Sequence, residues 1–333
     1  MSGKSYLITG GTGFIGSALT RRLVGDGFAV RVLDDGSRGR QGRLADLAAD
    51  IEFVDGDIRD ADAVARAAAG VDGILHLAYV NGTEFFYSKP DLVLDVGVRG
   101  MINVIDAALA NGVGELILAS SSEVYQTPPT LPTPEDVPLV VPDVHNPRYS
   151  YGGGKIISEL MALNYGRSKF ERVQIFRPHN VYGPDMGWEH VLPQFVLRMR
   201  DLAAQAEGRV SFPIQGSGWE TRAFVFIDDF VDGVRTMMER GEHLGIYHVG
   251  NTEEVSIAET ARLVAGYFDI EIDIAPGELQ PGGTLRRCPD ISKLAALGYA
   301  PKVPLAAGVP ILAAWYDAHA DERPGAENDK ENS

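Results

Sequence analysis

The glycine-rich stretch at residues 5–16, SYLITGGTGFIG, constrains the fold of this chain more than any other feature. A short apolar run leads into a turn with glycine at positions 10, 11, 13 and 16, and an amphipathic segment follows at once. This order predicts a strand, a tight turn and a helix. Glycine permits positive φ angles and close approach of bare backbone to a ligand, and a helix start offers free N–H groups. The stretch therefore predicts a site for an anion such as a pyrophosphate.

A second apolar run, residues 29–33, ends at Asp34, which lies eighteen residues beyond Gly16. In a dinucleotide-binding fold, an acid near this position hydrogen-bonds the adenosine ribose. A carboxylate there repels the 2′-phosphate of NADP, so the pattern favours NAD as the cofactor. The alternative is that Asp34 is only a turn residue ahead of Gly36, and the cations Arg38 and Arg40 follow closely.

Apolar runs alternate with amphipathic segments through the first half of the chain. Strands are expected at 51–54, 73–78, 115–119 and 172–176, and helices at 61–69, 91–110 and 151–165. Such alternation requires right-handed crossovers and a parallel sheet that is covered on both faces. We therefore expect an α/β fold with a Rossmann-type, doubly wound parallel sheet.

The second half of the chain has shorter elements and more glycine and proline breaks. The stretch 126–147 has seven prolines and predicts a long loop. We expect an NAD-binding Rossmann domain at 1–181, a smaller α/β substrate domain at 182–320 and a disordered tail at 321–333. The segment 224–245 is expected to rejoin the sheet of the first domain, which would make the two domains interleaved.

Charge and cysteine content exclude several classes of function. The 333 residues have a formal net charge of −16 and no basic cluster, so neither nucleic acid nor an anionic membrane is expected as a partner. The single cysteine, Cys288, excludes an intrachain disulfide and a cysteine metal cage, and no metal site is expected. No apolar run approaches eighteen residues and the glycine turn comes too early for a signal peptide, so we expect a cytoplasmic location.

Three side chains form the candidate catalytic group. Tyr151 and Lys155 are four residues apart, so a helix places them on one face, although this spacing is often only structural. Ser121 follows the strand expected at 115–119, at the edge where open α/β sheets hold their ligands. An ammonium group about 4–6 Å away, helped by an oxidised nicotinamide, favours the phenolate; lowering its pKa by roughly three units takes about 4 kcal/mol. Tyr151 is then a proton acceptor at neutral pH.

On these residues the chain resembles the extended short-chain dehydrogenase/reductases, and among them the nucleotide-sugar epimerase/dehydratase family. The resemblance covers residues 5 to about 317. Its motifs, in that family's order, are GGTGFIG (10–16), GDI (56–58), HLA (76–78), SSSEVY (120–125), SYGGGK (150–155), RPHNVYGP (177–184), GSGWETRAFVFIDD (216–229) and RRCPDISK (286–293). The resemblance implies a homodimer formed through the helices near 91–110 and 151–168.

The resemblance also implies a role for each matched residue. The implied cofactor contacts are Gly10, Gly13, Phe14, Ile15, Gly16, Asp34, Asp57, Ile58, Leu77, Ala78, Tyr151 and Lys155. Ser121 would hold the sugar hydroxyl, Tyr151 would be the base and Lys155 would orient it. The implied contacts to a nucleotide-diphosphate sugar are Ser122, His179, Asn180, Leu192, Arg222 and Arg287. Of these, Asn180 and the two arginines would bind the diphosphate, since guanidinium forks match phosphate oxygens.

The residues after the catalytic serine bear on the reaction, which in every branch begins with oxidation of the sugar to a 4-keto intermediate. Related 4,6-dehydratases have Asp-Glu here, whereas Ser122-Glu123 resembles UDP-glucuronate decarboxylase. A uronate carboxylate needs its own cation, yet the stretch 183–190 offers only His190 beside Asp185 and Glu189. We therefore expect a 4-epimerase, as in UDP-glucose 4-epimerase. Glu123 keeps the decarboxylase and the dehydratase open, and a non-catalytic NAD-binding sensor or scaffold is the alternative of another class.

Two departures from the family's pattern are glycines. The family commonly has Asn ahead of its Gly-Thr pair, where this chain has Gly97, and Gly154 replaces the usual Ser before the lysine. Positions 152–154 are then all glycine within a predicted helix, and each costs up to about 1 kcal/mol relative to alanine. They leave room either for substrate or nicotinamide, or for a tightly packed neighbour.

Overall fold

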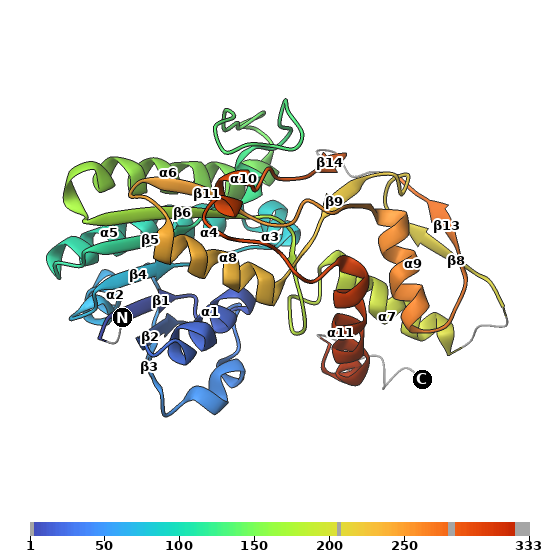
Figure 1. Ribbon diagram of the computed structural model, residues 1–333, viewed down its shortest axis with the longest axis horizontal. Coiled ribbons are helices and arrows are strands. Elements are labelled where there is room, and N and C mark those ends of the chain that lie inside the picture. The colour runs from blue at the N-terminus through green and yellow to red at the C-terminus, as the bar shows by residue number, and fades with distance from the viewer. Residues whose placement is uncertain (1–2, 205–207, 279–283, 324–333) are drawn as a thin grey trace. The chain divides into compact units, whose positions relative to one another are not determined.

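The structure, a computed structural model, describes residues 3–204, 208–278 and 284–323. The chain divides into two compact units (Figure 1). The first unit consists of 1–179, 230–249 and 290–300, and the second of 180–229, 250–289 and 301–333. The units are interleaved, because the chain leaves the first unit at Asn180 and returns to it twice.

A seven-stranded sheet forms the centre of the first unit. Its strand order is β11 (Gly245–Val249), β6 (Arg172–Pro178), β5 (Glu115–Ala119), β4 (Gly73–His76), β1 (Ser5–Thr9), β2 (Ala29–Asp34) and β3 (Ile51–Asp55). All neighbouring pairs are parallel. The order reverses between β1 and β4, and such a switch point is where open α/β sheets bind ligands. The predicted doubly wound α/β fold is confirmed.

Helices cover both faces of this sheet (Figure 1). α2 (Ala61–Ala68), α5 (Gly100–Ala110) and α6 (Ser150–Lys169) lie on one face, and α1 (Phe14–Gly25) and α8 (Ile227–Arg240) on the other. Under the first group, Val104, Ile105 and Leu116 belong to one fully buried apolar cluster. The helix expected at 91–110 exists as α4 (Pro90–Leu94), one π-helical turn at Asp95–Arg99, and α5.

Short elements complete the first unit. They are the helices α3 (Thr83–Ser88) and α10 (Ser292–Ala295) and the 3-10 turns Gln41–Leu47, Ser122–Val124 and Pro147–Tyr149. The proline-rich stretch 126–147 contains no α-helix and no extended strand, as expected for a loop, and its last residue begins the 3-10 turn Pro147–Tyr149.

Within its described residues, the second unit has three small sheets and three main helices. The sheets are β12 (Glu254–Ser256) with β9 (Thr221–Ala223) and β14 (Arg286–Arg287), β13 (Ile272–Pro276) with β8 (Val210–Ile214), and β10 (Val225–Phe226) with β7 (Val181–Tyr182). The helices are α7 (Val191–Ala203), α9 (Ile257–Tyr267) and α11 (Leu305–Ala318). Ser256 caps α9 by accepting the N–H of Glu259, so local sequence fixes where this helix begins.

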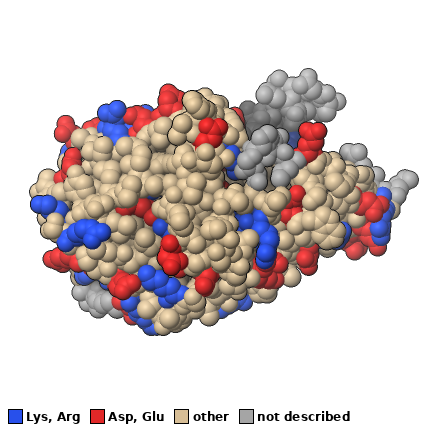
Figure 2. All heavy atoms as spheres, turned by 90° about the horizontal axis from the view of Figure 1, so that it is seen from above, with Lys and Arg blue, Asp and Glu red and all other residues tan. Residues whose placement is uncertain are grey.

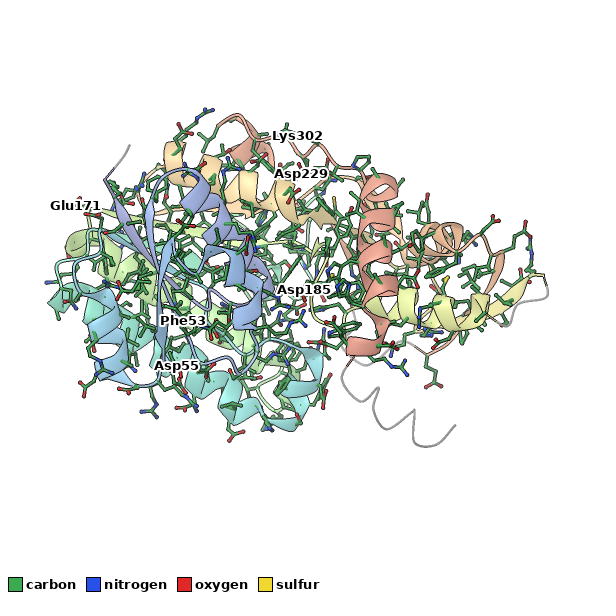
Figure 3. The ribbon with its side chains drawn as sticks, turned by 90° about the horizontal axis from the view of Figure 1, so that it is seen from below. Phe53, Asp55, Glu171, Asp185, Asp229 and Lys302 are labelled. Carbon is green, nitrogen blue, oxygen red and sulfur yellow. The ribbon has the colours of Figure 1, made fainter. Side chains whose placement is uncertain are left out.

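The expectation that the segment 224–245 rejoins the first domain holds for residues 230–245, which belong to the first unit, whereas the apolar run at 224–227 does not join the central sheet. Only β10 forms there, and its Val225 N–H donates to the carbonyl of Asn180 within the second unit. Just beyond, the Asp229 carboxylate accepts the backbone N–H groups of Lys302 and Val303, each at 2.8 Å (Figure 3). Residues 224–229 therefore belong to the second unit, and β11 supplies the seventh strand of the central sheet.

The predicted tail at 321–333 lies partly outside the described residues, which end at 323. Its first two residues, Asp321 and Glu322, belong to the 3-10 turn Ala320–Glu322, so the prediction of disorder is wrong for them. Among the described residues, no helix is both long and apolar enough to cross a membrane, and no cluster of potential metal ligands occurs. On the face shown in Figure 2, acidic and basic side chains are interspersed.

Candidate active site

The glycine turn lies between β1 and α1, beside the end of β4. Gly10 has φ +74°, and a Cβ there would lie 2.7 Å from the backbone nitrogen of Ala78. At Gly16 a Cβ would lie 2.1 Å from the carbonyl oxygen of Gly10. Both positions therefore exclude any side chain, and Leu77 and Ala78 lie against the turn, while their contact with a cofactor stays a prediction. The turn presents bare backbone immediately ahead of the first turn of α1, where a helix attracts anions.

Asp34, at the end of β2, is 8% exposed and is tied to the glycine turn. Its Oδ2 accepts the N–H of Thr12 at 2.9 Å, and its Oδ1 accepts the N–H of Gly36, also at 2.9 Å. The residue thus also has the turn role considered from the sequence. Nearby, Asp57 pairs with Arg59 at 2.6 Å, which keeps the pKa of the Asp57 carboxyl below its usual value.

The three candidate catalytic side chains meet at the carboxyl end of β5. Ser121 comes two residues after β5, and its Oγ accepts the N–H of Glu123 at 3.1 Å. Tyr151 and Lys155 lie in the first turns of α6, and the phenol of Tyr151 hydrogen-bonds the Ser121 side chain. The Lys155 Nζ donates to the carbonyl of Ala119 at 2.7 Å and lies 5.8 Å from the centre of the Tyr151 ring. The structure therefore brings together the three residues that the sequence singled out.

Burial dominates the electrostatics of this group. Tyr151 is 7% exposed, and burial raises its pKa to about 12 even though the hydrogen bond with Ser121 acts in the opposite direction; the Glu123 charge raises it further. Burial also lowers the pKa of Lys155 to about 7, against the attraction of Glu159. In the protein alone the phenol is therefore protonated at neutral pH, and the lowered pKa expected beside an oxidised nicotinamide stays a prediction. The reason is that desolvation outweighs the hydrogen bond with Ser121, while burial leaves Lys155 only partly charged at neutral pH.

Aromatic side chains surround the Tyr151 ring. Phe86 from α3 stacks on it, with ring centres 4.9 Å apart, and Tyr79 meets it edge to face at 5.1 Å. Phe86 is itself 5% exposed, so it belongs to the core. Sequence reasoning missed Tyr79, whose ring centre lies 4.0 Å from the Lys155 Nζ. The two glycines that depart from the family's pattern, Gly97 and Gly154, are the signal that could have revealed it.

A buried ion pair lies one helical turn behind Lys155. Glu159 and Arg177 form two hydrogen bonds, Nη2 to Oε2 at 2.6 Å and Nε to Oε1 at 2.8 Å, and both side chains are at most 3% exposed. Ser120 donates its hydroxyl to the same carboxylate at 2.5 Å. Sequence reasoning also missed this pair. Its only local trace is that Glu159 follows Lys155 at the same four-residue spacing as Lys155 follows Tyr151.

The residues predicted to bind a diphosphate come together in the second unit. Arg222 on β9 and Arg287 on β14 are direct partners in a parallel pairing. The Arg222 Nη2 donates to the carbonyl of Thr284 at 2.8 Å, and the Arg287 Nη2 to the hydroxyl of the same residue at 3.1 Å. Asn180 donates to the carbonyl of Ala223 at 3.0 Å, beside Arg222. Guanidinium forks match the oxygens of a phosphate, so this arrangement suits a phosphate group.

The remaining predicted substrate contacts are buried. Ser122 is 6% exposed in its 3-10 turn, and Leu192 is 1% exposed in α7. His179 is 1% exposed and packs its ring against that of His248, with centres 4.6 Å apart. Ile58, a predicted cofactor contact, is 4% exposed and belongs to the apolar core below α5. These positions show packing roles, and direct contact of these side chains with a ligand stays a prediction.

Comparison with known proteins connects this geometry to a family. The sequence pattern of the NAD dependent epimerase/dehydratase family matches residues 6–250. UDP-glucuronic acid decarboxylase 2 of Arabidopsis thaliana is 32% identical over 319 residues, which are 93% of this chain and 67% of that protein. The dTDP-glucose 4,6-dehydratase of Streptomyces antibioticus is 31% identical over 322 residues, covering 94% and 92%.

Solved structures give the same picture. The dTDP-glucose 4,6-dehydratase of Streptomyces venezuelae, with NAD and TYD bound, superposes with a TM-score of 0.84 at 29% identity and covers 97% of this chain and 99% of that one. The UDP-glucose 4-epimerase of Thermus thermophilus in complex with NAD has a TM-score of 0.81 at 25% identity, covering 94% and 98%.

Proposed function

This chain belongs to the NAD dependent epimerase/dehydratase family, and we propose that it is an NAD-dependent enzyme that oxidises a nucleotide-linked sugar at C4 and then restores it as the 4-epimer. The observation that carries the proposal is the meeting of Ser121, Tyr151 and Lys155 at the carboxyl end of β5. A non-catalytic sensor or scaffold has no need for a buried lysine held beside a buried phenol.

The residues of the first unit fit NAD. Gly10 and Gly16 exclude side chains from the turn ahead of α1, which suits a pyrophosphate. Asp34 at the end of β2 suits a ribose with free hydroxyls and repels a 2′-phosphate. When bound, oxidised NAD supplies a hydride acceptor and a positive charge that favours an ionised phenol. That charge is what the protein alone lacks, since burial keeps the pKa of Tyr151 at about 12.

The side chains then divide the proton chemistry among them. The Ser121 hydroxyl holds the sugar hydroxyl, and the Tyr151 phenolate accepts the proton of that hydroxyl as the 4-keto sugar forms. The Lys155 ammonium, fixed by its hydrogen bond to the carbonyl of Ala119, stabilises the phenolate. After the keto sugar turns over, Tyr151 returns the proton to the oxygen at C4. Low exposure of all three side chains excludes water from the reacting atoms.

The chain's own residues favour epimerisation among the family's reactions. A 4,6-dehydratase needs an acid where this chain has Ser122, and a decarboxylase needs a cation for the sugar carboxylate, whereas the stretch 183–190 holds Asp185 and Glu189. The second candidate is decarboxylation of a nucleotide-linked uronate. It is supported by the Ser122-Glu123 pair and by the similarity to UDP-glucuronic acid decarboxylases.

Mass spectrometry separates these outcomes. The purified protein is incubated with UDP-, GDP-, CDP-, ADP- and dTDP-linked sugars, both neutral and uronate, and the products are weighed and separated by chromatography. We expect an isomer of unchanged mass and no net formation of NADH. Loss of carbon dioxide from a uronate would replace the epimerase by the decarboxylase, and loss of water would show a dehydratase. Absence of any product across the panel would favour the non-catalytic alternative.

Replacing Arg287 tests the diphosphate site. Arg287→Met is expected to raise KM by about ten- to a hundredfold with kcat little changed, because a hydrogen bond to a charged group contributes roughly 1.5–3 kcal/mol and is present throughout the reaction. Arg286→Met is the matched control, because the Arg286 side chain is 54% exposed and pairs with Glu254. Equal KM values for the two variants would remove Arg287 from the substrate site.

An exposed apolar surface on α4, α5 and α6 supports a homodimer. Leu94, Ile102, Ile157, Leu160 and Tyr165 are each 38–56% exposed there. A second copy of the chain would bury them. Leu160→Glu is therefore expected to convert the dimer to a monomer in size-exclusion chromatography with light scattering, because a carboxylate cannot be buried cheaply in an apolar interface.

The control for this surface is Ile311→Glu, at a residue of α11 in the second unit that is 50% exposed. It should leave the mass in solution unchanged. A monomeric wild-type protein would refute the proposed dimer directly.

A further inference from the structure

Tyr79 is a large aromatic residue placed directly over the candidate catalytic lysine. It lies three residues beyond β4, and its ring centre is 4.0 Å from the Lys155 Nζ, nearer than the ring of Tyr151 at 5.8 Å. Its hydroxyl is buried and has no hydrogen-bond partner among the residues that the structure describes. The side chain is thus held by its ring contacts, and a buried hydroxyl without a partner is a cost that some other advantage must offset.

The two glycines that depart from the family's pattern make room for this hydroxyl. A Cβ at Gly97 would lie 2.1 Å from the Tyr79 hydroxyl oxygen, and a Cβ at Gly154 would lie 2.0 Å from the same atom. By contrast, a Cβ at Gly153 would meet nothing closer than Val141, at 3.5 Å. The glycines at 97 and 154 therefore leave room for a packed neighbour, and that neighbour is Tyr79.

The surroundings of Lys155 explain what the ring supplies. The ammonium donates to the carbonyl of Ala119, is attracted by Glu159 one turn along α6, and is close enough to His76 on β4 to lower the pKa of that histidine. Glu159 is itself paired with Arg177 from β6, so its negative charge is shared. The face of an aromatic ring attracts a cation most strongly where water is excluded, as it is here.

We propose that Tyr79 is a positioning residue whose ring holds the Lys155 ammonium in its charged form beside Tyr151, and that Gly97 and Gly154 are the small residues which admit it. The assignment rests on the proposed function only where it concerns catalysis. The ring, the lysine and the two glycines are contacts of the folded protein, and they can be tested without turnover.

The catalytic part is tested by two variants of Tyr79. Tyr79→Phe keeps the ring and is expected to retain kcat within about twofold. Tyr79→Leu removes the cation–π contact, so Lys155 loses charge and stabilises the phenolate less. In the Tyr79→Leu variant, the acidic limb of the pH profile of kcat should therefore move to higher pH by about one unit. The kcat of this variant at pH 7 should fall about tenfold, with KM little changed. Identical pH profiles for the Leu and Phe variants would overturn the proposal.

A second readout needs no substrate. Lysine labelled with ¹³C at Cε reports the titration of Lys155 by NMR, with the signal assigned through Lys155→Met. Tyr79→Leu should lower the titration midpoint of this lysine, whereas Tyr79→Phe should leave it unchanged. If the wild-type protein showed no turnover, the proposed function would be wrong. The titration of Lys155 would still test the role of Tyr79, because it needs no substrate. An unchanged midpoint in the Leu variant would overturn that role.

The packing part has its own matched set. Gly154→Ala should lower the melting temperature, and adding Tyr79→Phe should restore it, because the nearest remaining atom of residue 79 is then the ring carbon, 3.4 Å from the new Cβ. Gly97→Ala should not be rescued by Tyr79→Phe, because its Cβ would still lie 2.2 Å from that carbon. Gly153→Ala should be neutral or stabilising, since alanine favours helix. Equal melting temperatures for the Gly153 and Gly154 variants would contradict the packing.

Discussion

Tyr151→Phe is expected to lower kcat by about 10²–10⁴-fold, the usual contribution of a positioned general base, while NAD binding and the fold persist. Phenylalanine keeps the ring that stacks on Phe86 and meets Tyr79 edge to face, and it removes only the hydroxyl that hydrogen-bonds Ser121. Turnover is measured by chromatography of the nucleotide sugar. Cofactor binding is measured separately, by titration with NADH fluorescence.

Tyr165→Phe is the matched control on the same helix. Its side chain is outside the catalytic group, and phenylalanine keeps the ring that Tyr165 contributes to the proposed dimer surface, so turnover should be unchanged. The wild-type rate should also rise with pH along an acidic limb, because the burial that raises the pKa of Tyr151 to about 12 leaves the phenol protonated until the cofactor charge is present. For the same reason the affinity for oxidised NAD should increase with pH. A Tyr151→Phe variant that turns over within a few-fold of wild type would show that the phenol is not the base.

The fold could be predicted because its signals are local. The glycine turn and the alternation of apolar runs with amphipathic helices determine a doubly wound sheet before any tertiary contact is known. The partner of a short apolar run is a tertiary property, however. The run at 224–227 is more apolar than Gly245–Val249, which includes Tyr247 and His248, yet the latter pairs with β6. Which sheet a short strand joins is decided by its flanking contacts, such as the one between Val225 and Asn180.

The candidate site divides in the same way. Tyr151 and Lys155 could be found because a helix brings residues four apart together. The pairing of Arg222 with Arg287 joins strands of three and two residues that are far apart in the sequence, and only the resemblance to a family indicated it. Tyr79 could not be placed because the sequence shows the two glycines and not the side chain that fills the space they leave.

Glu159→Gln is expected to cost about 3–5 kcal/mol of unfolding free energy, because it leaves the Arg177 guanidinium buried without a counter-charge. Burial alone would lower the pKa of Arg177, and the hydrogen bonds and charge of Glu159 raise it above its usual value. A glutamine of the same shape still offers one acceptor, but its amide nitrogen is a second donor facing a guanidinium that only donates. The loss is measured from the midpoint and slope of urea unfolding without NAD.

Two comparisons isolate the buried pair. Glu271→Gln breaks a pair between Arg209 and Glu271 whose side chains are 56% and 74% exposed, and it should cost at most about 1 kcal/mol. Combining Glu159→Gln with Arg177→Met removes the uncompensated charge and should recover part of the lost unfolding free energy. If the two substitutions acted independently, the double variant would instead be less stable than either single variant. If Glu159→Gln cost no more than the surface control, the pair behind Lys155 would contribute nothing to stability, and the Glu159 charge would act only on the pKa of the lysine. The effect of Glu159→Gln would then be seen only in the turnover rate, because losing the Glu159 charge lowers the pKa of Lys155 further and weakens the stabilisation of the phenolate by Lys155.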